Sequence, residues 1–323
     1  MLSDETSPKK IKPLISVCMI TYRHENYLEQ AVESILMQEG EFEMELVISN
    51  DNSPDKTAEI VKRLIANHNK GNCIKYFCPE KNLGVTQNLI FALKQCQGKY
   101  IAICEGDDFW TDETKLQKQI EFLENHEDYV VTYHDALVVN ENGEVLKDSK
   151  LPASCRKDFT QIELMKGAYL LFLSICFRNI IEDYPREIYS VSTPDVFITS
   201  LLGNYGKGKY LPFIQKAGYR LHGGGVWGKK AQIKKLEMRL SLFKSLNSFY
   251  RSKDREVSFY YSDRISGTLR PIIFEYAKSK NWEAFINYCK LYFKHVKGIK
   301  KVNSLLFIQK MFLLFIIHRF LKN

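Results

Sequence analysis

The stretch GKYIAICEGDDFW, residues 98–110, joins a short apolar run directly to a cluster of carboxylates. Residues 100–104 have the length and composition of a buried strand. Glu105, Asp107 and Asp108 follow it at once, and carboxylates beside a buried strand are costly unless something positive lies close to them. The stretch therefore predicts a strand that carries acidic side chains to one edge of a sheet.

The sequence on both sides of this stretch repeats the same strand-then-helix pattern. Apolar runs alternate with segments whose apolar residues recur at helical spacing. Such alternation implies right-handed crossovers and a mostly parallel sheet flanked by helices, an α/β, Rossmann-like fold whose ligands bind at the carboxyl ends of the strands. The expected strands are 14–20, 46–48, 74–77, 100–104 and 130–139, and the expected helices are 26–38, 55–69, 85–95 and 116–123.

The chain divides into three parts by composition. Residues 1–12 form a polar tail, and 13–227 carry the α/β pattern. Residues 228–323 have few glycines and suggest a helical C-terminal region rich in Lys, Leu, Phe and Tyr, with the boundary near Trp227.

Composition limits the class of protein and its compartment. The 323 residues are 45% hydrophobic and carry a net charge of +8, which suits a phosphorylated substrate, an anionic membrane or nucleic acid. No nucleic-acid motif accompanies this charge, so we expect no nucleic-acid partner. The eight cysteines are scattered without metal-ligand spacing, and the N-terminus lacks an apolar signal core, so we expect a cytoplasmic protein.

The acidic cluster has two interpretations. Closely spaced oxygen ligands suit a hard divalent cation, Mg²⁺ or Mn²⁺, which also takes phosphate oxygens. Alternatively, Asp112 caps the following helix and the acids favour its dipole. Gly106, the repeated acids and the position after a strand together favour the metal site.

A second polar segment, ISNDNSPDKT at 48–57, also follows a strand and opens a helix. Asp51 could accept hydrogen bonds from the base or ribose of a nucleotide. Ser53 or Asp55 could serve as the helix N-cap, and the two interpretations are compatible.

These segments, with ISVCMITYR at 15–23 and NLGVTQN at 82–88, resemble the family 2 glycosyltransferases of the GT-A fold over roughly residues 13–227. The resemblance implies that Thr21 and Tyr22 line the base pocket and that Asp51 contacts the base. Asp107 would bind the metal, while Glu105 would face ribose or a metal-bound water. The implied donor-binding residues are Thr21, Tyr22, Asp51, Gly84, Glu105, Asp107 and Arg220, and the implied metal ligands are Asp107, Asp108 and His222.

Two positions depart from the family pattern. Asn50 stands where many members have aspartate, and Glu105 stands where most have aspartate. Both residues keep hydrogen-bonding capacity. They also leave open a non-catalytic interaction protein on the same scaffold.

A third signal comprises TPDVF at 193–197 and YRLHGGGVW at 219–227. In similar glycosyltransferases the acid here is the general base and the Tyr-Arg-x-His segment closes over the diphosphate, which implies Asp195 as base. An N-cap role after Pro194 is the alternative. His222 could supply a neutral imidazole to the metal, donate to phosphate, or be structural. The glycines after it favour close backbone approach to a ligand.

The resemblance implies an inverting enzyme that moves a sugar from a nucleoside-diphosphate sugar to an acceptor hydroxyl. UDP is expected first, with dTDP and GDP open. The acceptor would be a glycan or a lipid-linked molecule, in surface polysaccharide or glycan biosynthesis.

The C-terminal tail combines lysines with an apolar run. Lys294, Lys297, Lys300 and Lys301 precede apolar residues 305–317, which Gln309 and Lys310 interrupt. One interpretation is an interfacial helix on the inner face of the plasma membrane, and a membrane-surface scaffold that acts through this tail is a further alternative for the function. The alternative is a helix that packs on protein.

Overall fold

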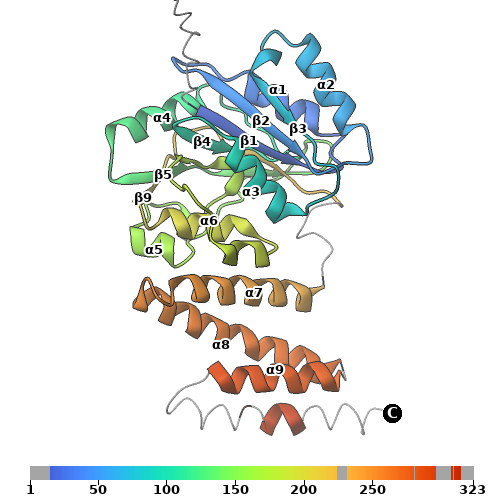
Figure 1. The fold of residues 1–323 in the computed structure, drawn as a ribbon, viewed down its shortest axis with the longest axis vertical. Helices are drawn as coiled ribbons and strands as arrows, with labels where there is room; N and C mark the ends of the chain where they lie inside the picture. Colours follow the sequence, from blue (N-terminus) through green and yellow to red (C-terminus); the bar gives the residue numbers. More distant parts are fainter. Residues whose placement is uncertain (1–14, 224–230, 280, 296–306, 308, 314–323) are drawn as a thin grey trace, which may run out of the picture. The chain divides into compact units, whose positions relative to one another are not determined.

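The computed structural model describes residues 15–223, 231–279, 281–295, 307 and 309–313 (Figure 1). They form two compact units. The first contains the described residues up to Tyr184 and those from Ile198 to the gap at 224, and the second contains 185–197 and the described residues beyond the gap. The expected tail at 1–12 and the expected boundary at Trp227 lie outside the described residues.

A seven-stranded sheet forms the centre of the first unit. Its strand order is β3-β2-β1-β4-β8-β5-β9, and β8 alone among these runs antiparallel to its neighbours. The mostly parallel α/β sheet expected from the sequence is confirmed. The strands are β1 (Ile15–Thr21), β2 (Met44–Asn50), β3 (Ile74–Phe77), β4 (Tyr100–Ile103), β5 (Tyr129–Tyr133), β8 (Cys176–Arg178) and β9 (Lys207–Tyr210).

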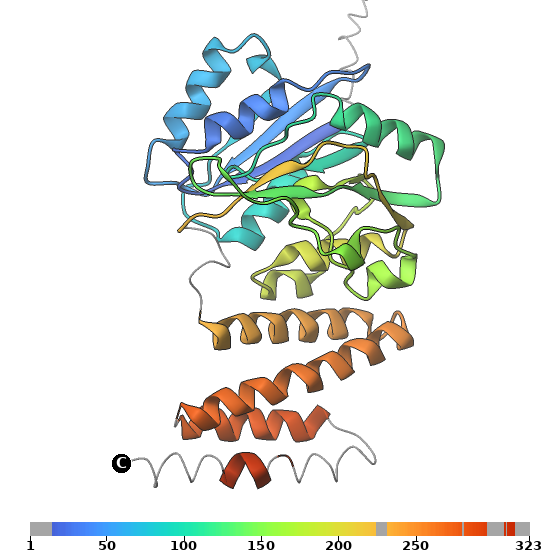
Figure 2. The same cartoon turned by 180° about the vertical axis from the view of Figure 1, so that it is seen from behind.

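The connections place helices on both faces of this sheet (Figures 1 and 2). From β1 the chain moves outward through β2 to β3, and then returns to β4 on the other side of β1. With right-handed crossovers, the first two helices cover one face and α3 covers the other. The helices are α1 (Leu28–Leu36), α2 (Thr57–Asn67), α3 (Val85–Gln95), α4 (Lys115–Asn125) and α5 (Gln161–Met165). The strand order therefore reverses between β1 and β4, where sheets of this kind bind ligands.

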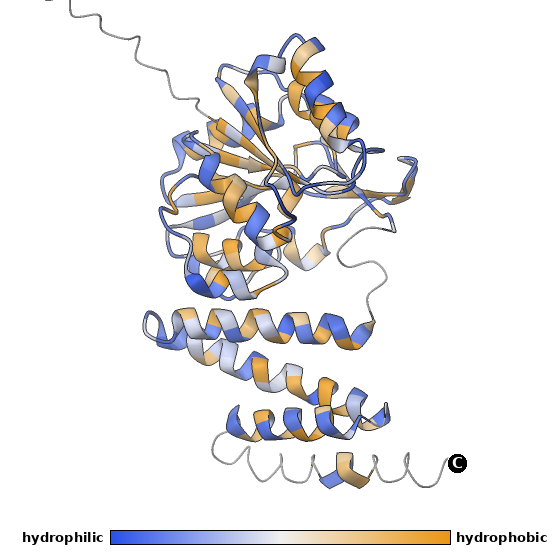
Figure 3. Ribbon diagram, turned by 45° about the vertical axis from the view of Figure 1, so that its right-hand side comes forward, coloured by the Kyte–Doolittle hydropathy of each residue, from blue (hydrophilic) through white to orange (hydrophobic). Residues whose placement is uncertain are grey.

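The core explains why these segments fold as they do. Every residue of β1 is buried, as a central strand covered on both faces requires. Leu28, Ala31, Val32 and Ile35 of α1 are fully buried at helical spacing. Apolar residues accordingly concentrate in the central strands, while the helices alternate between apolar and polar residues (Figure 3).

The prediction of a single strand at 130–139 is wrong, because His134 and Asp135 separate two strands that belong to different sheets. Strand β5 ends at Tyr133, and β6 (Ala136–Val139) joins a separate sheet of order β10-β6-β7 with β7 (Val145–Lys147) and β10 (Ala217–Arg220). The Asp135 carboxylate accepts the backbone N–H groups of Ala136 and Leu151, at 2.8 and 2.9 Å. These bonds turn the backbone out of the first sheet, and an alternation of apolar residues cannot reveal them.

The second unit is helical, as expected for the C-terminal region. It contains α7 (Gln232–Tyr250), α8 (Arg255–Lys278) and α9 (Trp282–His295). Helix α6 (Pro194–Leu202) starts in this unit and ends in the first. Asp254 caps α8 by accepting the Val257 N–H at 2.9 Å. Among the described residues, no helix combines the length and apolar character needed to cross a membrane.

Candidate functional site

The loops that follow β1, β2 and β4 meet at the point where the strand order reverses. Asp51, after β2, donates its backbone N–H to the Thr21 carbonyl at 2.9 Å, and Gly106, after β4, donates to the Ile20 carbonyl at 3.0 Å. A β-carbon built on Gly106 would lie 2.6 Å from Thr21 Oγ1 and 3.1 Å from His24 Nδ1. Only glycine therefore lets the acidic loop lie this close to the end of β1.

Three potential metal ligands converge at this edge: His24, Asp107 and His222. Their ligand atoms all lie within 4.8 Å of one another. His222 Nε2 is 2.9 Å from Asp107 Oδ2, and His24 Nε2 is 3.8 Å from the same oxygen. The side chains are 15%, 21% and 7% exposed in the order His24, Asp107, His222, so the cluster is sheltered but accessible to a ligand. The sequence prediction that Asp107 and His222 act together is consistent with this geometry.

The ionisation of the cluster suits a cation. Burial by itself raises the pKa of Asp107, but His24 and His222 beside it outweigh that effect and hold the pKa below its usual value. Burial is also the largest influence on His24, and it lowers the pKa of that imidazole despite the nearby Asp107. An ionised carboxylate beside a neutral imidazole is a donor set that divalent transition metals accept.

The other two acids of the cluster face different surroundings. Asp108 is buried, and its Oδ1 accepts the Arg220 backbone N–H at 2.8 Å. Burial, with the adjacent Asp107 and Glu105, raises the pKa of Asp108 well above its usual value. Glu105 is half-buried. Among the described residues, neither acid belongs to the group of converging ligands.

Arg220 points into the protein and is held by several acceptors. Its Nε donates to the Asp107 carbonyl at 3.0 Å, and its terminal nitrogens donate to the carbonyls of Asn140 and Glu141 and to Gln30 Oε1. The guanidinium lies over the ring of Tyr27, 4.8 Å from its centroid. Arg220, which the sequence predicts to bind the donor, therefore holds the acidic loop in place through its hydrogen bond to the Asp107 carbonyl.

Asp51 and Gly84 contact each other directly. The Asp51 carboxylate accepts the backbone N–H groups of Leu83 at 2.6 Å and Gly84 at 2.9 Å. Gly84 has φ +80° at the N-cap of α3, a conformation that favours glycine. The side chain of Tyr22 is 38% exposed beside this edge, and Thr21 is buried.

The capping alternatives are partly realised nearby. Asp112 Oδ1 accepts the Thr114 N–H at 3.0 Å just before α4, and Asp55 Oδ1 accepts the Thr57 N–H at 3.2 Å at the start of α2. Asp195 lies in the first turn of α6, in the second unit, and burial raises its pKa. The glycines at 224 and 225 lie outside the described residues.

Sequence reasoning missed His24 and Tyr27. His24 follows β1 by three residues, and the rule that ligands bind after parallel strands applies to it as much as to Thr21. Tyr27 packs against the His222 ring with centroids 5.1 Å apart, and only folding brings these two positions together.

Comparisons with known proteins support the family resemblance of the sequence. Residues 16–173 match the family model described as Glycosyl transferase family 2. An uncharacterized protein of Mycobacterium tuberculosis is 31% identical over 216 residues, which are 66% of this chain and 60% of the relative. The minor teichoic acid biosynthesis protein GgaB of Bacillus subtilis is 33% identical over 116 residues, 36% of this chain and 12% of GgaB. The chain thus aligns with less than two thirds of the length of either relative.

Solved structures share the fold at low sequence identity. S. aureus TarS 1-349 in complex with UDP-GlcNAc superposes with a TM-score of 0.64 at 18% identity, covering 88% of this chain and 81% of that one. The mannosyltransferase PcManGT of Pyrobaculum calidifontis, in complex with GDP-Man and Mn²⁺, gives 0.56 at 12% identity, covering 97% and 89%. The architecture is therefore that of a GT-A-like fold.

Proposed function

With residues 16–173 forming a family 2 glycosyltransferase domain, we propose that this protein transfers a sugar from a nucleoside-diphosphate sugar to an acceptor hydroxyl. The observation that carries the proposal is the convergence of Asp107, His222 and His24 where the strand order reverses. A UDP-sugar is the expected donor, which the complex of TarS with UDP-GlcNAc supports.

Asp107 and His222 would hold a divalent cation in this site. A carboxylate and an imidazole fit Mn²⁺, and PcManGT contains Mn²⁺ together with its donor. When bound, the cation supplies charge stabilisation for the leaving diphosphate. Thr21, Tyr22 and Asp51 would form the side of the site that receives the nucleotide, because they lie at the carboxyl ends of the neighbouring strands β1 and β2.

Asp195 is the proposed general base. The acceptor oxygen would form its bond to the anomeric carbon while the bond to the diphosphate breaks, with inversion, and the acceptor's proton would pass to the Asp195 carboxylate. A positioned base of this kind contributes about 10²- to 10⁴-fold to the rate. The assignment rests on the family resemblance of the segment at 193–197, in which Asp195 lies in the first turn of α6.

The acceptor is proposed to be a surface glycan or a lipid-linked precursor. GgaB, which shares a third of its aligned residues with this chain, is named for teichoic acid biosynthesis. Leu313 and Lys310 are both exposed in the C-terminal unit, which supports contact with a lipid surface.

Calorimetry with UDP, GDP and dTDP, with and without Mn²⁺, tests the proposal. Wild type should bind one nucleotide in a metal-dependent manner, and Asp107→Asn should lose that binding. Asp183→Asn, at an exposed carboxylate of the same unit, is the matched control and should bind as wild type. If wild type binds no nucleotide under any metal condition, the proposed function is wrong.

A further inference from the structure

His24 shares the edge of the sheet with Asp107 and His222 but belongs to none of the motifs that the sequence singled out. It comes from the loop between β1 and α1, whereas Asp107 follows β4 and His222 follows β10. Three separate segments therefore bring one ligand atom each to a common point. The His24 side chain is 15% exposed, so it is not simply a surface group that happens to lie near a carboxylate.

The separations of the three side chains suit ligands of one ion. Ligand atoms that sit about 2.1 Å from the same metal lie roughly 3 to 4 Å from one another. The distances from Asp107 Oδ2 to the Nε2 atoms of His222 and His24 are 2.9 and 3.8 Å. The two imidazole rings meet edge to face with centroids 5.7 Å apart, so both can direct Nε2 to the same carboxylate.

The other nitrogen of His24 has an orienting partner. Nδ1 lies 3.2 Å from Thr21 Oγ1, which can accept a hydrogen bond from Nδ1–H and so leave the Nε2 lone pair directed at the cluster. Metal-bound histidines characteristically have such a partner on the second ring nitrogen. Gly106 keeps this arrangement tight, because any β-carbon there would press on both Thr21 Oγ1 and His24 Nδ1.

We propose that His24 is a protein ligand of the cation, so that two imidazoles and one carboxylate hold it. This proposal rests on the proposed function, and it specifies the metal. Imidazole nitrogen suits first-row transition ions, whereas Mg²⁺ prefers oxygen ligands and keeps its waters. The site therefore selects Mn²⁺ or a related transition ion over Mg²⁺, and His24 supplies much of that selectivity.

The test measures Mn²⁺ and Mg²⁺ binding to the full chain without substrate, by calorimetry and by pulsed EPR of bound Mn²⁺. Wild type should prefer Mn²⁺ and show couplings to two imidazole nitrogens. His24→Gln should show one nitrogen and bind Mn²⁺ at least about tenfold more weakly, with a smaller loss for Mg²⁺. His68→Gln is the matched control, because His68 also pairs with a carboxylate, Glu33, at 3.3 Å.

The outcomes separate this proposal from the proposed function. If His24→Gln keeps the wild-type Mn²⁺ affinity and both nitrogen couplings while Asp107→Asn loses the metal, His24 is not a ligand and the glycosyltransferase proposal stands. If wild type binds neither ion yet binds a nucleotide, the metal assignment fails alone. Equal losses in His24→Gln and His68→Gln would also overturn the proposal, because they would reflect general destabilisation.

Discussion

The carboxylate of Asp51 holds the backbone of Gly84, whose N–H donates to Oδ2 at 2.9 Å. The neighbouring Leu83 N–H donates to Oδ1 at 2.6 Å, and the carboxylate is almost fully buried. An acid expected to recognise a nucleotide base therefore also fixes the loop before α3. Its structural and binding roles can be separated by measurement.

Asp51→Asn should destabilise the protein. An amide has one acceptor oxygen, so one of the two backbone bonds would be lost. The Gly84 N–H also reaches Asn82 Oδ1 at 3.1 Å, so the expected loss is that of a single hydrogen bond, about 1 kcal/mol. Urea unfolding measures this loss. Glu121→Gln, at an exposed carboxylate on α4, should change stability little. Unchanged stability in Asp51→Asn would show that the two backbone bonds matter less than their geometry indicates.

Arg220→Lys should also unfold more easily than wild type. The lysine keeps the charge but cannot satisfy the carbonyls of Asp107, Asn140 and Glu141 together, and the loss should be at least about 2 kcal/mol. The exposed Arg255→Lys is the control. If Arg220→Lys instead keeps its stability and loses only nucleotide affinity, the arginine serves the diphosphate and not the loop.

How much the sequence reveals differs between the fold and the site. Strand and helix periodicity locates β3 and α3 to the residue, because local burial alone determines those patterns. The same periodicity does not reveal the end of β5 before Asp135. The Asp135 side chain accepts backbone N–H groups there, one of them 16 residues further along the chain. Asp107 is visible as one of several acids after a strand. The distinct surroundings of Asp108 and Asp107 depend on Arg220, more than a hundred residues later, and no local pattern contains that contact.

Lys115 should make the free energy of unfolding increase as the pH rises through the alkaline range. The residue is 1% exposed. Its amine lies 3.9 Å from the centroid of the Trp110 ring and donates to Gln119 Oε1, and burial lowers its pKa to about 8. Between that value and about 10.5 the unfolded chain holds a proton that the folded chain has lost. The free energy of unfolding therefore rises with pH in this window.

Unfolding at pH 7.5 and 9.5 compares wild type with Lys115→Met. The wild-type increase should exceed that of the variant by about 2 kcal/mol. Lys62→Met, at an exposed lysine of α2, should retain the wild-type pH dependence. Parallel curves for wild type and Lys115→Met would mean that the buried amine stays protonated throughout, stabilised by the Trp110 ring.

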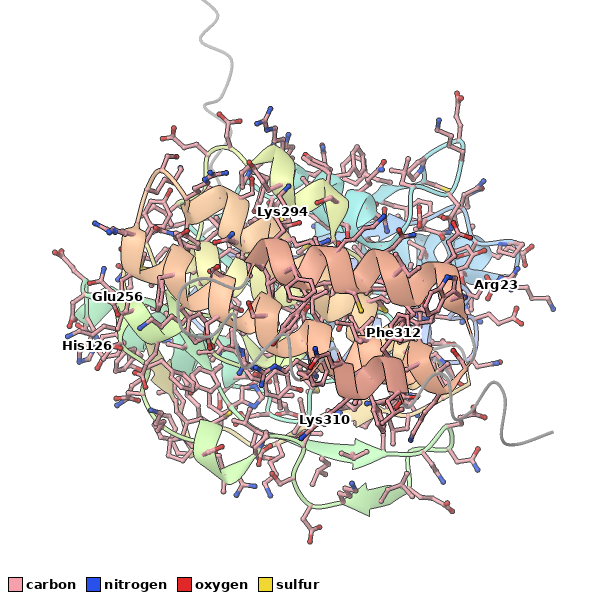
Figure 4. The ribbon with its side chains drawn as sticks, turned by 90° about the horizontal axis from the view of Figure 1, so that it is seen from below. Arg23, His126, Glu256, Lys294, Lys310 and Phe312 are labelled. Atoms are coloured by element: carbon pink, nitrogen blue, oxygen red, sulfur yellow. The ribbon has the colours of Figure 1, made fainter. Side chains whose placement is uncertain are left out.

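The described C-terminal residues should contribute to vesicle binding. Leu313 is 60% exposed, and Phe312 is 42% exposed although it contacts the Trp282 ring with centroids 5.1 Å apart. Lys294 and Lys310 belong to the same unit (Figure 4). Each lysine near an anionic surface contributes about 1 kcal/mol, and burying a leucine contributes roughly 1.5–3 kcal/mol.

Leu313→Ser should therefore weaken sedimentation with phosphatidylserine vesicles about tenfold, and salt should weaken binding of wild type and variant alike. Leu146→Ser is the matched control, since Leu146 is 54% exposed on β7 of the first unit. Equal losses of vesicle binding in the two variants would point to nonspecific adsorption of apolar side chains. Wild-type binding that does not change with salt or with lipid charge would point to the same conclusion. Absence of wild-type binding would favour the packing of this segment on protein, because the exposed leucine would then have no lipid surface to enter.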